Sequence, residues 1–211
     1  MLKIDQLAPS RIIPVVVIEE VGYAERLREA LKSGGLTCAE VTFRTSAAGQ
    51  SIRIMAEDPD FCVGAGTVLT GLQVDEAVQA GARFIVSPGI DATVVEASRQ
   101  QQIPVFPGVI TPSEIMTGLA LGLSELKFFP AGTAGGPAAI RALGGPFGSV
   151  SFIPTGGISP GNVHEYLSLP NVAAIGGTWL TPASALRAGD FRAITELTRE
   201  AVRLADQGDS A

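Results

Sequence analysis

The chain has 211 residues, of which 46% are hydrophobic and 17% charged, and its formal net charge is −6. This composition allows a large buried core, and the negative charge argues against a nucleic-acid or anionic-membrane partner. No signal-peptide pattern precedes the first predicted strand, and no apolar run approaches the roughly 20 residues of a membrane span. We therefore expect a cytoplasmic protein without a membrane segment.

Strand-like and helical patterns alternate along the whole chain. Short β-rich runs predict strands at 12–18, 38–44, 61–68, 84–88, 104–109, 125–130, 151–155 and 171–178. Helical patterns occur at 22–33, 47–57, 71–80, 91–101, 112–122, 135–144, 160–168 and 188–206. The length suits one large domain or two small ones, and no linker stands out. We expect one domain over 1–211, with 1–10 as an N-terminal extension and 207–211 as a disordered tail.

Eight strand–helix units of this kind predict a parallel α/β fold. Their number and regularity favour a small (β/α)₈ TIM barrel, and an open doubly wound sheet is the alternative. Cys38 and Cys62 both fall in predicted strands. We interpret them as reduced core residues, which is usual for a cytoplasmic protein, and regard a disulfide as the lesser alternative.

The strand predicted at 38–44 has one polar face and one apolar face. Alternation places Glu40, Thr42 and Arg44 on the face opposite to Ala39 and Val41. The apolar face should pack on the outer helices, so the polar face should point into the barrel, with Arg44 nearest the C-terminal mouth where barrel active sites form. A structural ion pair between Glu40 and Arg44 is the alternative to a catalytic role.

Lys127 is the only one of the three lysines that lies in a hydrophobic strand. A lysine in an apolar strand either extends to water or does chemistry. Burial disfavours an ammonium ion, and a free amine is the nucleophile of Schiff-base catalysis. If Lys127 faces inward, it shares a cavity with Glu40, and a glutamate among apolar walls can donate and accept protons near neutrality.

Two glycine pairs close the last two predicted strands. Gly156 and Gly157 follow Thr155, and Gly176 and Gly177 precede Thr178. Barrels commonly bind phosphate in these loops through backbone N–H groups, although glycines also simply permit tight turns.

Two other patterns carry less weight as functional sites. The single histidine, His164, lies in a predicted surface helix, and no cluster of metal ligands is evident. The run Gly64-Ala65-Gly66-Thr67 is superficially similar to a dinucleotide fingerprint, but Leu69 breaks that pattern.

Seven segments, in this order and spacing, resemble the bacterial 2-keto-3-deoxy-6-phosphogluconate (KDPG) and 4-hydroxy-2-oxoglutarate (KHG) aldolases. They are AEVTFRT at 39–45, VGAGTVL at 63–69, SPG at 87–89, PGVITPSEI at 107–115, LKFFPA at 126–131, PTGGI at 154–158 and GGTW at 176–179. The resemblance covers essentially the whole chain. It implies a class I aldolase that forms pyruvate and glyceraldehyde 3-phosphate from KDPG, needs no metal or organic cofactor and is usually a homotrimer.

The resemblance also implies a role for each matching residue. Lys127 would form the Schiff base and Glu40 would be the general acid/base, commonly through a bound water. The remaining roles divide between the two ends of the substrate. Arg44 and Thr67 would bind the carboxylate, Pro88 and Phe129 would shape the pocket, Thr155 would contact the hydroxyls, and Gly156, Gly157 and Thr178 would bind the phosphate.

The sequence departs from the family's usual pattern at two of these segments. Thr178 stands where serine is common, and Ile110 replaces a smaller residue. Thr155 matches the gluconate-type enzymes, whereas galactonate-type relatives tend to have valine. The enzyme alternatives are a 2-dehydro-3-deoxy-6-phosphogalactonate aldolase or a sugar-phosphate epimerase or isomerase barrel, and the non-enzyme alternative is a catalytically silent ligand-binding barrel.

Overall fold

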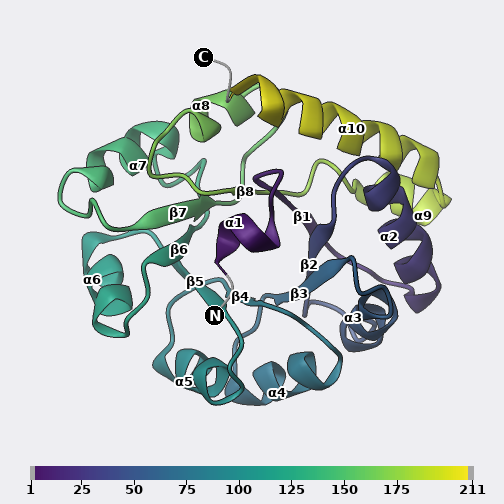
Figure 1. Ribbon diagram of the computed structural model, residues 1–211, viewed down its shortest axis with the longest axis horizontal. Helices are drawn as coiled ribbons and strands as arrows, with labels where there is room; N and C mark the ends of the chain where they lie inside the picture. Colours follow the sequence, from purple (N-terminus) through teal and green to yellow (C-terminus); the bar gives the residue numbers. More distant parts are fainter. Residues whose placement is uncertain (1–2, 209–211) are drawn as a thin grey trace.

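The computed structural model describes residues 3–208 and contains eight strands surrounded by helices (Figure 1). The strands are β1 (Ile12–Val16), β2 (Cys38–Thr42), β3 (Cys62–Gly66), β4 (Ile85–Ser87), β5 (Val105–Val109), β6 (Glu125–Phe128), β7 (Ser151–Pro154) and β8 (Ile175–Gly177). The helices are α1 (Ile4–Leu7), η1 (Val21–Tyr23), α2 (Ala24–Ser33), α3 (Ala48–Ala56), α4 (Gly71–Gln79), α5 (Ala92–Gln100), α6 (Pro112–Ala120), α7 (Gly136–Gly144), α8 (Val163–Leu167), α9 (Ala183–Ala188) and α10 (Phe191–Gly208).

All eight strands are parallel and form one sheet in the order β7-β6-β5-β4-β3-β2-β1-β8. The two ends of this sheet meet through isolated bridges that pair Phe152 with Val172 and Thr155 with Gly176. The ring is therefore nearly closed, and the predicted TIM barrel is confirmed. No helix within residues 3–208 is long and apolar enough to cross a membrane.

The alternation predicted for β2 determines which side chains face outward. Ala39 and Val41 belong to the apolar cluster that packs on α2 and α3, whereas Cys38 belongs to the cluster inside the barrel. Cys38 and Cys62 are register partners on β2 and β3, and both thiols are buried and free. Glu40 and Thr42, which alternate with Ala39 and Val41, therefore lie on the inner face of β2, nearer the C-terminal mouth than Cys38.

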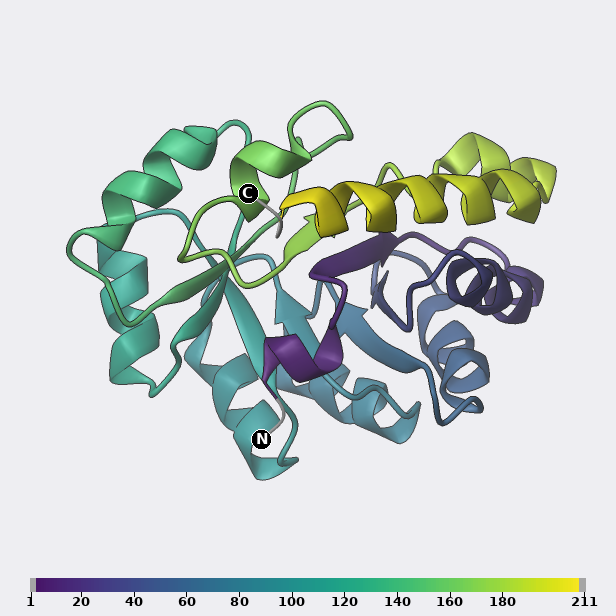
Figure 2. The ribbon, with the colours of Figure 1, turned by 45° about the horizontal axis from the view of Figure 1, so that its top comes forward.

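Helix α1 covers the N-terminal end of the barrel, where it lies across the centre of the strand ring (Figures 1 and 2). Its side chains Ile4 and Leu7 pack in one cluster with the barrel residues Phe84, Phe106 and Ile153. Residues 4–7 lie inside the segment predicted as an N-terminal extension. The barrel interior is consequently closed at this end by apolar contacts.

Several element boundaries differ from the predicted ones. β2 ends at Thr42, so Arg44 lies in the turn after the strand and not in it. The helix predicted at 188–206 is wrong in its start, because Gly189 has φ 64° and separates α9 from α10. α10 extends to Gly208, and residues 209–211 of the predicted tail lie outside the described residues.

Candidate active site

Lys127 and Glu40 meet inside the barrel. The Lys127 Nζ donates to Glu40 Oε1 at 3.3 Å, and the two residues are only 6% and 3% exposed. They come from β6 and β2, which lie on opposite parts of the strand ring. The two side chains therefore do meet inside the barrel, as predicted for an inward-facing Lys127, and Glu40 pairs with Lys127 instead of with Arg44.

The ring of Phe129 forms one wall beside the lysine. Its centroid lies 5.1 Å from Lys127 Nζ, within the range of a cation–π contact. The same ring lies next to Gly156, where an added Cβ would be 3.4 Å from two ring atoms. Phe129 therefore joins the lysine to the first glycine of the β7 loop.

Thr155 lies at the end of β7 and is 4% exposed. It pairs with Gly176, and a Cβ at Gly176 would overlap with the Thr155 side chain. Since glycine inside a strand often marks a close approach of this kind, Gly176 provides the space for the threonine hydroxyl. The Thr155 hydroxyl donates at 3.4 Å to the Ile153 carbonyl, a long bond that a ligand can replace.

The turns after β2 and β3 are held next to each other. The Phe43 N–H donates to the Gly66 carbonyl at 2.7 Å, which links the turn that carries Arg44 to the turn that carries Thr67. The following residue, Val68, donates to the Val86 carbonyl at 3.1 Å, close to the half-buried Pro88. Arg44 itself is exposed at this mouth.

Thr67 has an unusual backbone conformation for a β-branched residue. Its φ is 55°, in the left-handed region that favours glycine. Such conformations cost about 1–3 kcal/mol and tend to persist at functional sites, where the surrounding structure holds them. Here the bonds of Phe43 and Val68 hold the turn.

Gly156 and Gly157 form a loop in which both residues have positive φ, at 94° and 79°. The Gly157 carbonyl accepts from Asn162 Nδ2 at 3.0 Å, which fixes the loop against the segment before α8. Among residues 3–208, the N–H groups of Gly157 and Thr178 have no backbone acceptor, whereas that of Gly156 adjoins the bridge between Thr155 and Gly176. Free N–H groups on adjacent strand ends can bind an anion.

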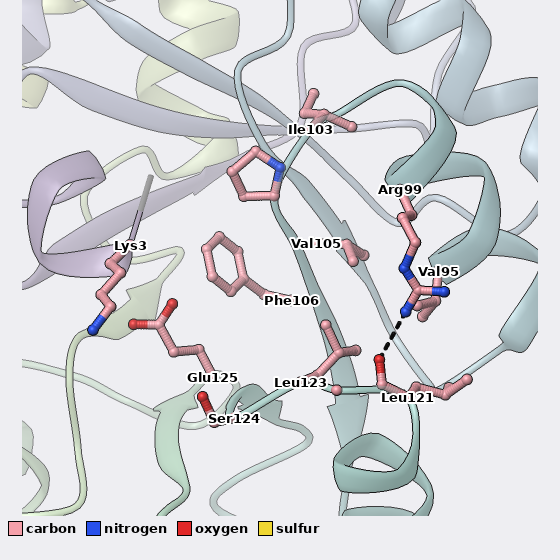
Figure 3. A pocket seen from close by; sticks show the side chains of 12 residues that line it. Lys3, Val95, Arg99, Ile103, Val105, Phe106, Leu121, Leu123, Ser124 and Glu125 are labelled. Carbon is pink, nitrogen blue, oxygen red and sulfur yellow. Dashed lines mark hydrogen bonds between the residues drawn. The ribbon is translucent and has the colours of Figure 1, made fainter. Parts of the chain in front are cut away.

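A separate cavity of about 240 Å³ opens at the N-terminal end of the barrel (Figure 3). Phe106, Leu123 and Arg99 line it, together with Glu125 at the start of β6. Glu125 Oε1 accepts the Ile4 N–H at 3.3 Å, and burial raises the pKa of this carboxyl. Neither Lys127 nor Glu40 lines this cavity, so it lies outside the lysine site.

Sequence reasoning placed Gly176 in a phosphate-binding glycine pair and gave Gly66 no role in the site, but it did not predict that each makes room for a polar side chain of the site, Thr155 and Glu40 respectively. On β3, glycine occupies the alternate positions 64 and 66 of one strand face. That alternation was visible in the sequence and indicates a hollow on the inner face. His164, the single histidine, lies in α8 on the outside of the barrel, as expected.

A parallel (β/α)₈ barrel that buries a lysine against a carboxylate has the architecture of an enzyme that forms Schiff bases with carbonyl substrates. The chain belongs to the KDPG and KHG aldolase family, whose model matches residues 4–197.

Three relatives illustrate the match. The KHG/KDPG aldolase of Escherichia coli is 47% identical over 197 residues, which cover 93% of this chain and 92% of that protein. The crystal structure of the Legionella pneumophila KDPG aldolase, with pyruvate captured as a covalent carbinolamine intermediate, is 44% identical and has a TM-score of 0.88. It covers 92% of this chain and 93% of that one. The Zymomonas mobilis KDPG aldolase with 3-phosphoglycerate is 43% identical, with a TM-score of 0.87 and coverage of 92% and 91%.

Proposed function

We propose that this protein is a class I aldolase that cleaves KDPG reversibly to pyruvate and glyceraldehyde 3-phosphate. The observation that carries the proposal is the buried Lys127–Glu40 pair inside a barrel of this family. The same site also suits 4-hydroxy-2-oxoglutarate, which would give pyruvate and glyoxylate. Both reactions break the C3–C4 bond of a 2-keto acid that carries a hydroxyl group on C4.

Lys127 is the proposed nucleophile. Its neutral amine adds to the C2 carbonyl, and loss of water from the carbinolamine gives a protonated imine. The imine accepts the electron pair of the C3–C4 bond when that bond breaks, so an enamine forms in place of an unstabilised carbanion. Hydrolysis of the imine later releases pyruvate and restores the amine.

Glu40 is the proposed general acid/base. It takes the proton of the C4 hydroxyl as the C3–C4 bond breaks, and the aldehyde product leaves. It then returns a proton to C3 of the enamine, which regenerates the imine. The 3.3 Å contact with Lys127 supports this role, because it places the carboxylate beside the carbon atoms that an imine on Lys127 would carry.

The ends of the substrate are assigned to the two sides of the barrel mouth. Arg44 and Thr67 bind the carboxylate, with Pro88 and Phe129 around the reacting carbons. The N–H groups of Gly156, Gly157 and Thr178 bind the phosphate, and the hydroxyl of Thr155 contacts the substrate hydroxyls. Binding energy from the phosphate is remote from the breaking bond and orients the chain for cleavage.

The test is a comparison of kcat/KM for cleavage of KDPG, its galactonate epimer and 4-hydroxy-2-oxoglutarate, with pyruvate release as the readout. We expect KDPG to have the highest kcat/KM of the three, because the Thr155 hydroxyl can hydrogen-bond to the C4 hydroxyl in the configuration that the gluconate substrate has. A preference for the galactonate epimer would overturn this assignment. Epimerase or isomerase activity without pyruvate release would contradict the aldolase proposal and support a sugar-phosphate epimerase or isomerase.

We also propose that the protein works as a homotrimer in the cytoplasm. Five large apolar side chains are exposed in the β3–α4 loop, α4, the β5–α6 loop and α6: Leu69, Leu72, Ile110, Met116 and Leu119. Exposed apolar side chains of this kind can take part in protein–protein contacts. Two free thiols in the core are in keeping with a reducing compartment.

A further inference from the structure

Two glycines on the inner face of β3 are next to side chains from neighbouring strands. Gly64 and Gly66 both point into the barrel, because they are register partners of Glu40 and Thr42. A Cβ on Gly64 would overlap with the ring of Phe84, and a Cβ on Gly66 would overlap with Oε1, Cγ and Cδ of Glu40. The hollow on β3 is thus filled by an aromatic ring below and by the Glu40 carboxylate above.

The carboxylate of Glu40 occupies the space that a side chain at position 66 would need. It reaches from its own strand over Gly66 toward the mouth, and there it meets Lys127 at 3.3 Å. Gly66 is not among the residues with positive φ, so its backbone is compatible with alanine. Glycine is needed at position 66 because it leaves space for the Glu40 side chain, and not because its backbone has an unusual conformation.

The two glycines differ in what must move if a methyl group is added. At Gly66 the obstacle is the Glu40 side chain from Cγ to Oε1, which can rotate about its own single bonds. At Gly64 the obstacle is a ring that is 1% exposed and packed among Phe106, Val86 and the residues of α1. Overpacking such a core costs stability, because neither ring nor neighbours can give way.

We propose that Gly66 is a positioning residue of the aldol reaction: its missing side chain seats the Glu40 carboxylate against Lys127. The inference rests on the proposed role of Glu40 as general acid/base. It predicts that Gly66→Ala displaces the carboxylate from the reacting carbons while the barrel stays folded. Gly64→Ala is the matched change two residues away on the same face of the same strand.

The experiment measures kcat, KM and Tm for Gly66→Ala, Gly64→Ala, Glu40→Ala and the double variant Gly66→Ala/Glu40→Ala. We expect Gly66→Ala to lower kcat by about 100-fold, within the range that general acid–base catalysis contributes, and to lower Tm less than Gly64→Ala does. Gly64→Ala should show the reverse, with a lower Tm and a kcat per folded molecule within about threefold of the native value. The double variant should be no slower than Glu40→Ala alone, since the clash is gone.

Each outcome has one interpretation. Near-native kcat in Gly66→Ala, with Glu40→Ala inactive, overturns the role of Gly66 and leaves that of Glu40 intact. Near-native kcat in Glu40→Ala overturns the proposed general acid/base and the inference with it. A double variant that is slower than Glu40→Ala by the full factor of Gly66→Ala would show that Gly66 acts independently of Glu40, which also contradicts the proposal.

Discussion

Lys127 and Glu40 lie together in the barrel interior, where almost no water reaches either charge. Removing an ion pair from water costs free energy that its mutual attraction does not fully return, so a buried pair is poor evidence of a stabilising role. Apolar residues normally fill this part of a TIM barrel. The pair is therefore best explained by chemistry, and Phe129 forms one wall beside it.

Thr67 is expected to act through its hydroxyl at the carboxylate end of the substrate. Thr67→Val keeps the branched shape and removes the hydrogen-bond donor, so we expect KM to rise about tenfold, as for the loss of one bond to a charged group. Tm should hardly change. The control is Thr117→Val on the exposed face of α6, which should leave KM and kcat unchanged. An unchanged KM in Thr67→Val would remove Thr67 from the site.

Glu125 gives the stability of the protein a pH dependence that can be measured. Burial is the main cause that raises the pKa of this carboxyl, and the charge of Asp5 adds to it, while the Ile4 N–H and Lys3 act in the opposite direction. A raised folded-state pKa favours folding below the ordinary glutamate value of about 4.3, and that contribution is lost as the pH rises through the folded-state value.

Glu125→Gln should therefore stabilise the protein at neutral pH. Glutamine keeps an oxygen that accepts the Ile4 N–H and carries no charge to desolvate. We expect Tm of the variant to exceed that of the native protein at pH 7.5, and the difference to shrink toward pH 4. Thermal unfolding of both proteins at both pH values is the test. A variant that is less stable than the native protein at pH 7.5 would contradict a raised pKa of the Glu125 carboxyl.

Particular residues show how far the site could be predicted. Strand alternation put Glu40 on the inner face of its strand and, if Lys127 also faced inward, brought the two side chains together, because side chains of a strand alternate strictly between two faces. The role of Gly66 could not be predicted, since it depends on how a glutamate from β2 crosses over β3. The left-handed conformation of Thr67 was equally hidden, because it depends on tertiary bonds of its neighbours, such as those of Phe43 and Val68.

At the scale of elements, α1 is part of the barrel core although it has only four residues. No sequence pattern predicts a helix this short, because a single helical turn has little stability of its own and depends on tertiary packing. The end of β2 was placed too late for a related reason. The sequence alternation continues to Arg44, but the Arg44 N–H bonds back to the Thr42 carbonyl, and the chain turns.

Leu7→Ala tests whether α1 seals the barrel. Leu7 is 2% exposed in the cluster that contains Ile13 and Phe84, and deleting such a side chain costs about 2–5 kcal/mol. We expect a loss of about 3 kcal/mol in chemical denaturation. Asp5→Ala in the same helix is the exposed control and should cost less than about 1 kcal/mol. Equal effects of the two substitutions would contradict the role of α1.

At the scale of the whole molecule, the large apolar side chains exposed on α4 and α6 predict self-association. Leu72 is 81% exposed and Met116 is 62% exposed, so neither contributes to the core of a single chain. A charge in the centre of an interface prevents association, because it cannot be desolvated without a partner. Leu72→Asp combined with Met116→Asp should therefore give a monomer with native secondary structure.

Sedimentation of the native and doubly substituted proteins gives the answer. We expect three chains per particle for the native protein and one for the variant. Gln50→Asp, at an exposed position of α3, is the control and should leave the mass of the native particle unchanged. A native protein that sediments as a monomer would overturn the proposed trimer and leave the aldolase assignment untouched.

The central claim is that Lys127 forms a covalent imine with a 2-keto acid. Incubation with pyruvate and sodium borohydride, followed by peptide mass spectrometry, tests it directly, because reduction makes the imine permanent. The chain has only two other lysines, Lys3 and Lys32, which serve as internal controls. We expect one reduced pyruvate unit on the Lys127 peptide, none on the other two, and none in a folded Lys127→Met variant. An adduct that is absent from the native protein, or that persists in Lys127→Met, would contradict the account.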